Sequence, residues 1–143
     1  MKITLTDSIN CAQKLKQHYI PLYSGQVSCG LFGIADDFVD DYLSLDTKYI
    51  KNKESTFFVK AQGDSMSPYI QPGDILIVDR SIPIFNGAVA TFFLNDNAIC
   101  KRYTNVEGII KLTSYSEAPD ITISEEDRLE LFGVVTGLAR DLF

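Results

Sequence analysis

From residue 56 onward, short runs of apolar and β-branched residues alternate with turn residues. Pro72-Gly73, Asn86-Gly87 and the tripeptide Asn95-Asp96-Asn97 separate these runs, the last as a tight hairpin. Strands are predicted at residues 56–61, 74–79, 88–94, 98–104, 108–114 and 127–139. Short strands at this spacing, without helices between them, predict a mainly β fold with a compact, largely antiparallel sheet or barrel body.

The amino-terminal part of the chain has a different pattern. Residues 1–30 show weak periodicity and include the stretch IPLYSGQVSCGLFG, which is rich in small and turn-forming residues and predicts an extended arm. In residues 35–45, apolar residues recur at helical spacing, with aspartates mostly opposite, which predicts one short amphipathic helix. The expected organisation is an arm over residues 1–30 and a β domain over residues 31–143.

Composition narrows the possible classes of protein. A chain of 143 residues with 45% hydrophobic residues is enough for one folded domain. The net charge of -6 and the pI of about 4.6 argue against direct binding to a nucleic-acid backbone. The chain has no apolar segment of signal-peptide or membrane-span length, so a soluble cytoplasmic protein without membrane contact is expected. Three cysteines without C-x-x-C spacing predict neither a disulfide framework nor a zinc site, and no cofactor is expected.

Ser65 is the residue that raises a question about chemistry. The segment AQGDSMSPYIQPGDILIVD, residues 61–79, places it between Asp64 and Met66, at the end of a predicted strand. A serine hydroxyl needs a nearby base to act as a nucleophile, and the only histidine, His18, lies in the polar arm, where a solvated surface role is expected.

A lysine with a pKa lowered by burial can act as that base instead. Lys101 lies in an apolar strand, where alternation places Ile99, Lys101 and Tyr103 on one face. Lys60 is its main rival, although it lies on the strand just before Ser65. From the residues alone, a turn serine and a surface-strand lysine remain the simpler interpretation.

Four motifs together resemble the UmuD proteins, relatives of the LexA-type self-cleaving peptidases. They are KAQGDSMSPYIQPGDILIVD, the Cys29-Gly30 dipeptide, CKR around Lys101, and LELFGVV near the carboxyl end, and the resemblance runs from about Pro21 to the end of the chain. It implies a β domain of the LexA carboxyl-terminal type. It also implies a Ser-Lys dyad, with Ser65 as the nucleophile, Lys101 as the general base and then acid, and Cys29-Gly30 as the bond that is cut. The oxyanion would be held by the backbone N–H of Ser65, with Met66 shaping the pocket.

The resemblance further implies a cellular context. Relatives of this kind are induced in the bacterial response to DNA damage, and a recombinase filament on single-stranded DNA promotes their self-cleavage. The trimmed form, here residues 30–143, would act as a homodimer that serves a Y-family DNA polymerase subunit in error-prone synthesis across lesions. These contacts would be with proteins, not directly with nucleic acid.

Three alternatives to this role exist, and the first of them stays open. The chain could be a dimeric interaction module of the same fold that partners the polymerase without catalysis. A LexA-like repressor is disfavoured because the residues before Cys29 are too few for a helix-turn-helix domain. A signal-peptidase-like role requires a membrane anchor that the sequence lacks.

Other conspicuous residues have simpler readings. No metal is predicted at Asp36, Asp37, Asp40 and Asp41, which are expected on a solvated helix face. Cys100 is expected to be a small buried or half-buried strand residue.

Overall fold

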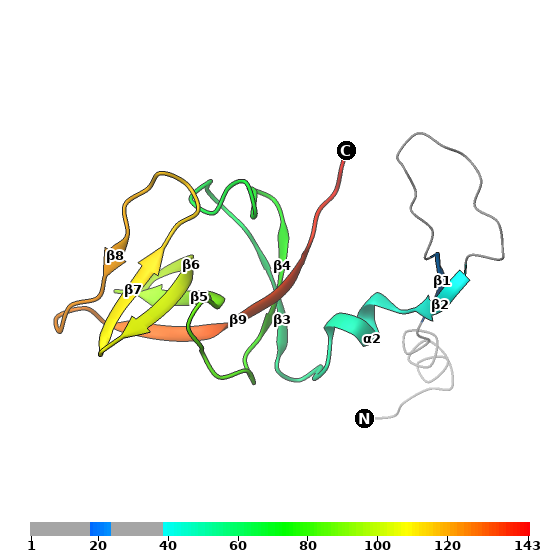
Figure 1. Ribbon diagram of the computed structural model, residues 1–143, viewed down its shortest axis with the longest axis horizontal. Coiled ribbons are helices and arrows are strands. Elements are labelled where there is room, and N and C mark those ends of the chain that lie inside the picture. Colours follow the sequence, from blue (N-terminus) through cyan, green and yellow to red (C-terminus); the bar gives the residue numbers. More distant parts are fainter. Residues whose placement is uncertain (1–17, 24–38) are drawn as a thin grey trace, which may run out of the picture. The chain divides into compact units, whose positions relative to one another are not determined.

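The structure is a computed structural model that describes residues 18–23 and 39–143 (Figure 1). The chain divides into two compact units, Met1–Ile50 and Lys51–Phe143. No helix among the described residues is long and apolar enough to cross a bilayer.

The described part of the first unit is a small antiparallel ladder followed by a helix. Strand β1, Ile20–Tyr23, pairs with strand β2, Val39–Leu43, and helix α2 covers Leu45–Tyr49. The predicted helix over residues 35–45 is therefore wrong where it overlaps β2, and residues 35–38 lie outside the described residues. So short a segment carries too few turns for its apolar spacing to separate a helix from a strand, and pairing with β1 decides the outcome.

The second unit is built on one seven-stranded sheet in the order β3-β4-β9-β5-β6-β7-β8, with every neighbouring pair antiparallel. The strands are β3 Thr56–Lys60, β4 Ile75–Asp79, β5 Val89–Leu94, β6 Asn97–Val106, β7 Ile109–Thr113, β8 Ile121–Thr122 and β9 Leu129–Ala139. The mainly β, largely antiparallel fold predicted from the pattern is confirmed. β8 was not predicted, because two residues are too few to leave a periodic signal.

Strand β9 joins the two halves of this sheet, since it pairs with β4 on one side and β5 on the other (Figure 1). Its register shifts once opposite Ile77 and Val78 and once opposite Thr91 and Phe92. Extra residues of this kind bend a strand and increase its twist. The long last strand can therefore curl around the core.

Two clusters of buried side chains form the core. One consists of Met66, Ile70, Leu76 and Val78, and the other of Ala90, Phe92 and Leu112. The first cluster matters most for the site, because two of its members come from the loop that carries Ser65.

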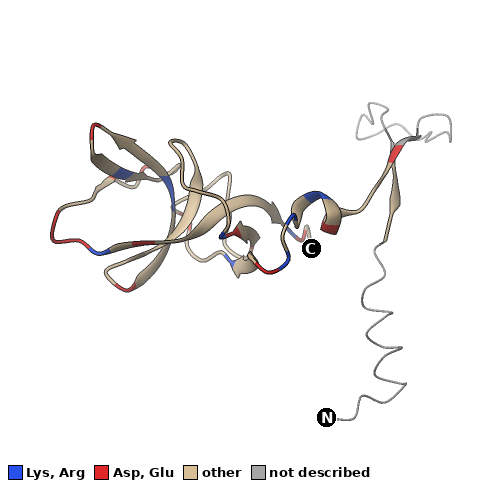
Figure 2. Ribbon diagram, turned by 90° about the horizontal axis from the view of Figure 1, so that it is seen from below, with Lys and Arg blue, Asp and Glu red and all other residues tan. Residues whose placement is uncertain are grey.

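The charged residues are scattered along the described part of the chain, and the basic ones form no continuous stripe over the described residues (Figure 2).

Candidate functional site

Ser65 lies in a loop after β3, not at a strand end as the sequence suggested. The chain leaves β3 at Lys60 and turns at Gly63, whose φ of +74° is a conformation that favours glycine. Met66, the next residue after Ser65, is only 3% exposed and anchors the loop in the first core cluster together with Ile70. This anchoring leaves Ser65 half-buried.

A second support holds the backbone of Ser65 itself. Its carbonyl oxygen accepts hydrogen bonds from the backbone N–H groups of Tyr115 and Ser116, both at 3.1 Å. The rings of Tyr69 and Tyr115 also approach each other, with centroids 4.5 Å apart. The segment that follows β7 therefore contacts the Ser65 loop through both backbone and side chain.

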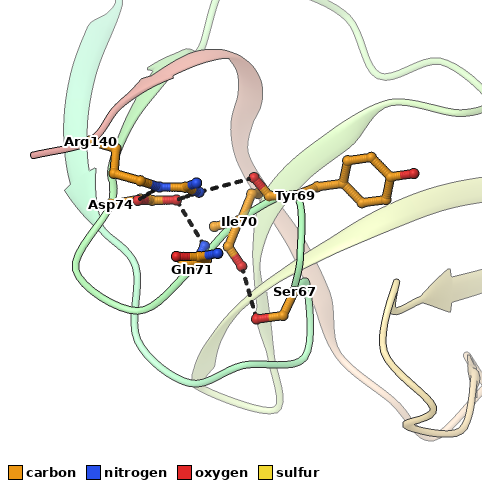
Figure 3. A network of polar contacts seen from close by, with 6 residues as sticks. All are labelled: Ser67, Tyr69, Ile70, Gln71, Asp74 and Arg140. Carbon is orange, nitrogen blue, oxygen red and sulfur yellow. Dashed lines mark hydrogen bonds and ion pairs between the residues drawn. The ribbon is translucent and has the colours of Figure 1, made fainter. Parts of the chain in front are cut away.

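An ion pair closes the far end of the same loop (Figure 3). Arg140 donates to both carboxylate oxygens of Asp74, at 2.7 and 2.6 Å, and to the carbonyl of Tyr69 at 3.3 Å. The N–H of Gln71 donates to Asp74 at 2.8 Å. The Arg140 guanidinium is the main cause that lowers the pKa of Asp74 to about 2 from its ordinary 3.8, against the opposing effect of burial. The loop is thus tied to the residue that follows β9.

Lys101 lies in the middle of β6, opposite Ala90 of β5, and is only 9% exposed. Burial lowers the pKa of its amine from the ordinary lysine value, and the neighbouring Cys100 opposes this shift. The Lys101 amine donates a hydrogen bond to the hydroxyl of Ser114 at 2.9 Å. Burial also raises the pKa of the Cys100 thiol to about 11, so this thiol stays protonated at neutral pH.

One cleft brings the predicted catalytic residues together. It has a volume of about 450 Å³, and Ser65, Met66 and Lys101 all line it. Its other lining residues are mostly apolar and include Ile70, Leu76, Phe93, Ile99 and Phe132. Such a cleft limits access of water and disfavours the charged form of an amine.

The rival base Lys60 lines the cleft as well, but its side chain is exposed. The predicted cut at Cys29-Gly30 lies outside the described residues, as do Asp36 and Asp37. His18 is described and exposed.

Sequence reasoning missed Ser114 and Arg140. The register of the β6–β7 hairpin pairs Val106 with Ile109 and Arg102 with Thr113. One step further along the same register, Lys101 meets Ser114. The two-residue turn at Glu107-Gly108 was therefore a signal from which this neighbour could have been found. Arg140 comes from the end of a distant strand and carried no such signal.

These features define a class of protein: an antiparallel β domain in which a loop serine and a buried strand lysine line one apolar cleft. Comparison with known proteins agrees with this class. Residues 21–136 match the family described as Peptidase S24-like, and the chain belongs to this family.

The relatives include repressors and smaller proteins. The LexA repressor of Clostridium tetani is 31% identical over 117 residues, which cover 81% of this chain and 58% of the repressor. Protein MucA of Salmonella typhimurium is 25% identical over 138 residues, 95% of this chain and 92% of MucA. Protein ImpA of the same organism is 28% identical over 117 residues, 81% of this chain and 80% of ImpA. The chain spans only 56–64% of the length of the LexA repressors it matches. The resemblance to the LexA and UmuD-like proteins seen in the sequence is confirmed.

Proposed function

We propose that this protein is a serine peptidase that cuts its own chain between Cys29 and Gly30, with Ser65 as nucleophile and Lys101 as general base. The observation that carries the proposal is the buried Lys101 amine, with its lowered pKa, in the same cleft as Ser65. A neutral amine can accept the serine proton, whereas an ammonium cannot.

The reaction proceeds in two stages. The Lys101 amine accepts the Ser65 hydroxyl proton while the oxygen attacks the Cys29 carbonyl carbon, and backbone N–H groups, with that of Ser65 as the first candidate, stabilise the oxyanion. The C–N bond to Gly30 then breaks, and the Lys101 ammonium gives its proton to the leaving amine. In the second stage, water attacks the Cys29 ester, Lys101 takes its proton, and the proton returns to Ser65. The products are residues 1–29 and 30–143.

The cellular role that fits this reaction is a one-time switch in the DNA-damage response. The similarity to proteins MucA and ImpA along most of their lengths supports an accessory role beside an error-prone Y-family polymerase. In this proposal the arm over residues 1–30 precedes a peptidase-like domain over residues 31–143. The trimmed protein acts as a homodimer in the cytoplasm, and a recombinase filament on single-stranded DNA activates the cut.

The test is an intact-mass time course of purified protein at neutral and alkaline pH, with and without an activated recombinase filament. Wild type is expected to split between Cys29 and Gly30, and Ser65→Ala and Lys101→Ala are expected to stay intact. Lys60→Ala is the matched control, because Lys60 lines the cleft but is exposed, and this variant is expected to split at the wild-type rate. Wild type that stays intact in every condition would refute the peptidase and favour a non-catalytic dimeric partner of the polymerase.

A further inference from the structure

We propose that Ser114 is a positioning residue for self-cleavage, and that the three residues Ser114–Ser116 set the general base against the nucleophile. The Ser114 hydroxyl holds the Lys101 amine, while the next two backbone N–H groups hold the Ser65 carbonyl. The inference rests on the proposed function, which it deepens.

The first half of the argument concerns the lysine. A lysine side chain has four rotatable bonds, and fixing them in one conformation costs rotamer entropy. Lys101 is only 9% exposed, so few water molecules can compete for its amine. The Ser114 hydroxyl, 2.9 Å from the nitrogen, supplies a fixed acceptor. A neutral amine that donates one N–H in this direction keeps its lone pair free to accept a proton from the cleft.

The second half concerns the serine. Two N–H groups that converge on the Ser65 carbonyl, each at 3.1 Å, fix the orientation of the peptide group that follows Ser65. The contact between the rings of Tyr69 and Tyr115 holds the same segment against the far side of the loop. The backbone position of Ser65, from which its side chain projects, is thereby tied to residues 115 and 116.

Covalent continuity joins the two halves. Successive Cα atoms are about 3.8 Å apart, so the hydroxyl that holds the base and the amides that hold the nucleophile cannot drift independently. Misplacement of a catalytic group by about 1 Å can cost on the order of a hundredfold in rate. A short segment that couples both groups is therefore a direct means of keeping the dyad aligned.

The experiment measures the first-order rate constant of self-cleavage by intact mass from neutral to alkaline pH, in Ser114→Ala, Ser114→Thr and Thr122→Ala. Thr122→Ala is the control, because it removes a hydroxyl from an exposed position of β8, outside the segment Ser114–Ser116. Ser114→Ala is expected to lower the alkaline plateau by about tenfold to a hundredfold. Ser114→Thr should restore the plateau to within a few fold, and Thr122→Ala should leave it unchanged.

Two results would overturn the inference. A Ser114→Ala plateau equal to wild type would show that the hydroxyl does not position the amine. Complete loss of cleavage in both Ser114→Ala and Ser114→Thr, with cleavage kept in Ser65→Ala, would make Ser114 itself the nucleophile. If wild type does not cleave at all, the proposed function itself fails. This outcome can be told apart from the two results above, because in both of them wild type cleaves.

A readout without cleavage uses the Ser65→Ala protein and follows the Lys101 amine by nitrogen-15 NMR during a pH titration. Adding Ser114→Ala should lower the pKa of Lys101 further, because the ammonium loses an acceptor. The other titratable groups nearby, Cys100 on the same strand and Lys60 in the lining of the cleft, are unchanged between the two proteins. An unchanged titration of Lys101 would count against the inference even if cleavage is never observed.

Discussion

The ion pair between Asp74 and Arg140 offers a test of what holds the Ser65 loop in place. Asp74 is 2% exposed and sits where the loop returns to β4, whereas the Arg140 side chain is 32% exposed. Arg140→Gln would remove the positive charge and the two-pronged hydrogen bonding to Asp74. The buried carboxylate would keep the N–H of Gln71 as a donor.

The size of the effect follows from burial. Removing one partner of a buried ion pair costs about 3–5 kcal/mol, because the remaining charge is left without compensation. Water reaches the guanidinium side of this pair, which places the expected loss between the values for an exposed and a buried pair, about 1–3 kcal/mol. For a domain of this size, such a loss lowers Tm by roughly 3–12 °C.

The assay is urea and thermal unfolding of wild type and Arg140→Gln, both in the Ser65→Ala background so that the chain stays intact. Arg128→Gln is the matched control, because Arg128 also pairs with an aspartate, Asp96, but at the surface, with side chains 66% and 81% exposed. An exposed pair is worth about 1 kcal/mol or less, so the control should unfold almost like wild type. Equal stability losses in the two variants would refute the argument from burial.

The same pair predicts how stability responds to acid. The folded-state pKa of Asp74 is about 2, below its ordinary 3.8, because of Arg140. Its contribution is therefore present above the ordinary value and is lost as the pH falls through the folded value. In Arg140→Gln this pKa should rise toward the ordinary value, so the part of acid destabilisation that belongs to Asp74 should shrink or disappear. Urea midpoints measured from neutral to acidic pH would detect the change.

Four further predictions follow from individual residues. Because burial lowers the pKa of Lys101, the rate of self-cleavage should rise with pH and level off below the ordinary lysine pKa, as measured by intact mass; a rate independent of pH would contradict Lys101 as the base. Gly133→Ala would place a Cβ 2.6 Å from Val78 Cγ1 and 3.2 Å from the Asp79 carbonyl oxygen, and should destabilise by about 1–3 kcal/mol in urea unfolding, so unchanged stability would mean the strands can separate there. Iodoacetamide should alkylate Cys100 far more slowly at neutral pH than it alkylates a fully exposed cysteine thiol, because the pKa of the Cys100 thiol is about 11. The rate of alkylation is read by mass after peptide digestion. Gly30→Glu should block self-cleavage without unfolding the chain, and a folded variant that cuts at the wild-type rate would contradict the position of the cut.

Local pattern was sufficient for most of the body. Six of the seven strands from Thr56 to Ala139, all but the short β8, were predicted because each alternates or concentrates apolar residues between turn signals, and turn chemistry acts over a few residues. Lys101 was a candidate base because it lies in an apolar strand, but from the residues alone a surface position remained the simpler interpretation, and the structure shows that it is buried. Strand β2 was not predicted, because it depends on a partner strand some twenty residues earlier in the chain.

The surroundings of the site depended on tertiary structure. Nothing local to Ser65 indicates that its carbonyl meets the amides of Tyr115 and Ser116, or that Arg140 holds the far end of its loop. These contacts join residues 50 to 71 positions apart, and only the folding of the sheet brings them together. Sequence by itself determined the strands and the reactive residue types, because both depend on short-range pattern. Only the tertiary structure decided which groups bury and orient Ser65 and Lys101, because the contacts that do so form only after the strands have paired.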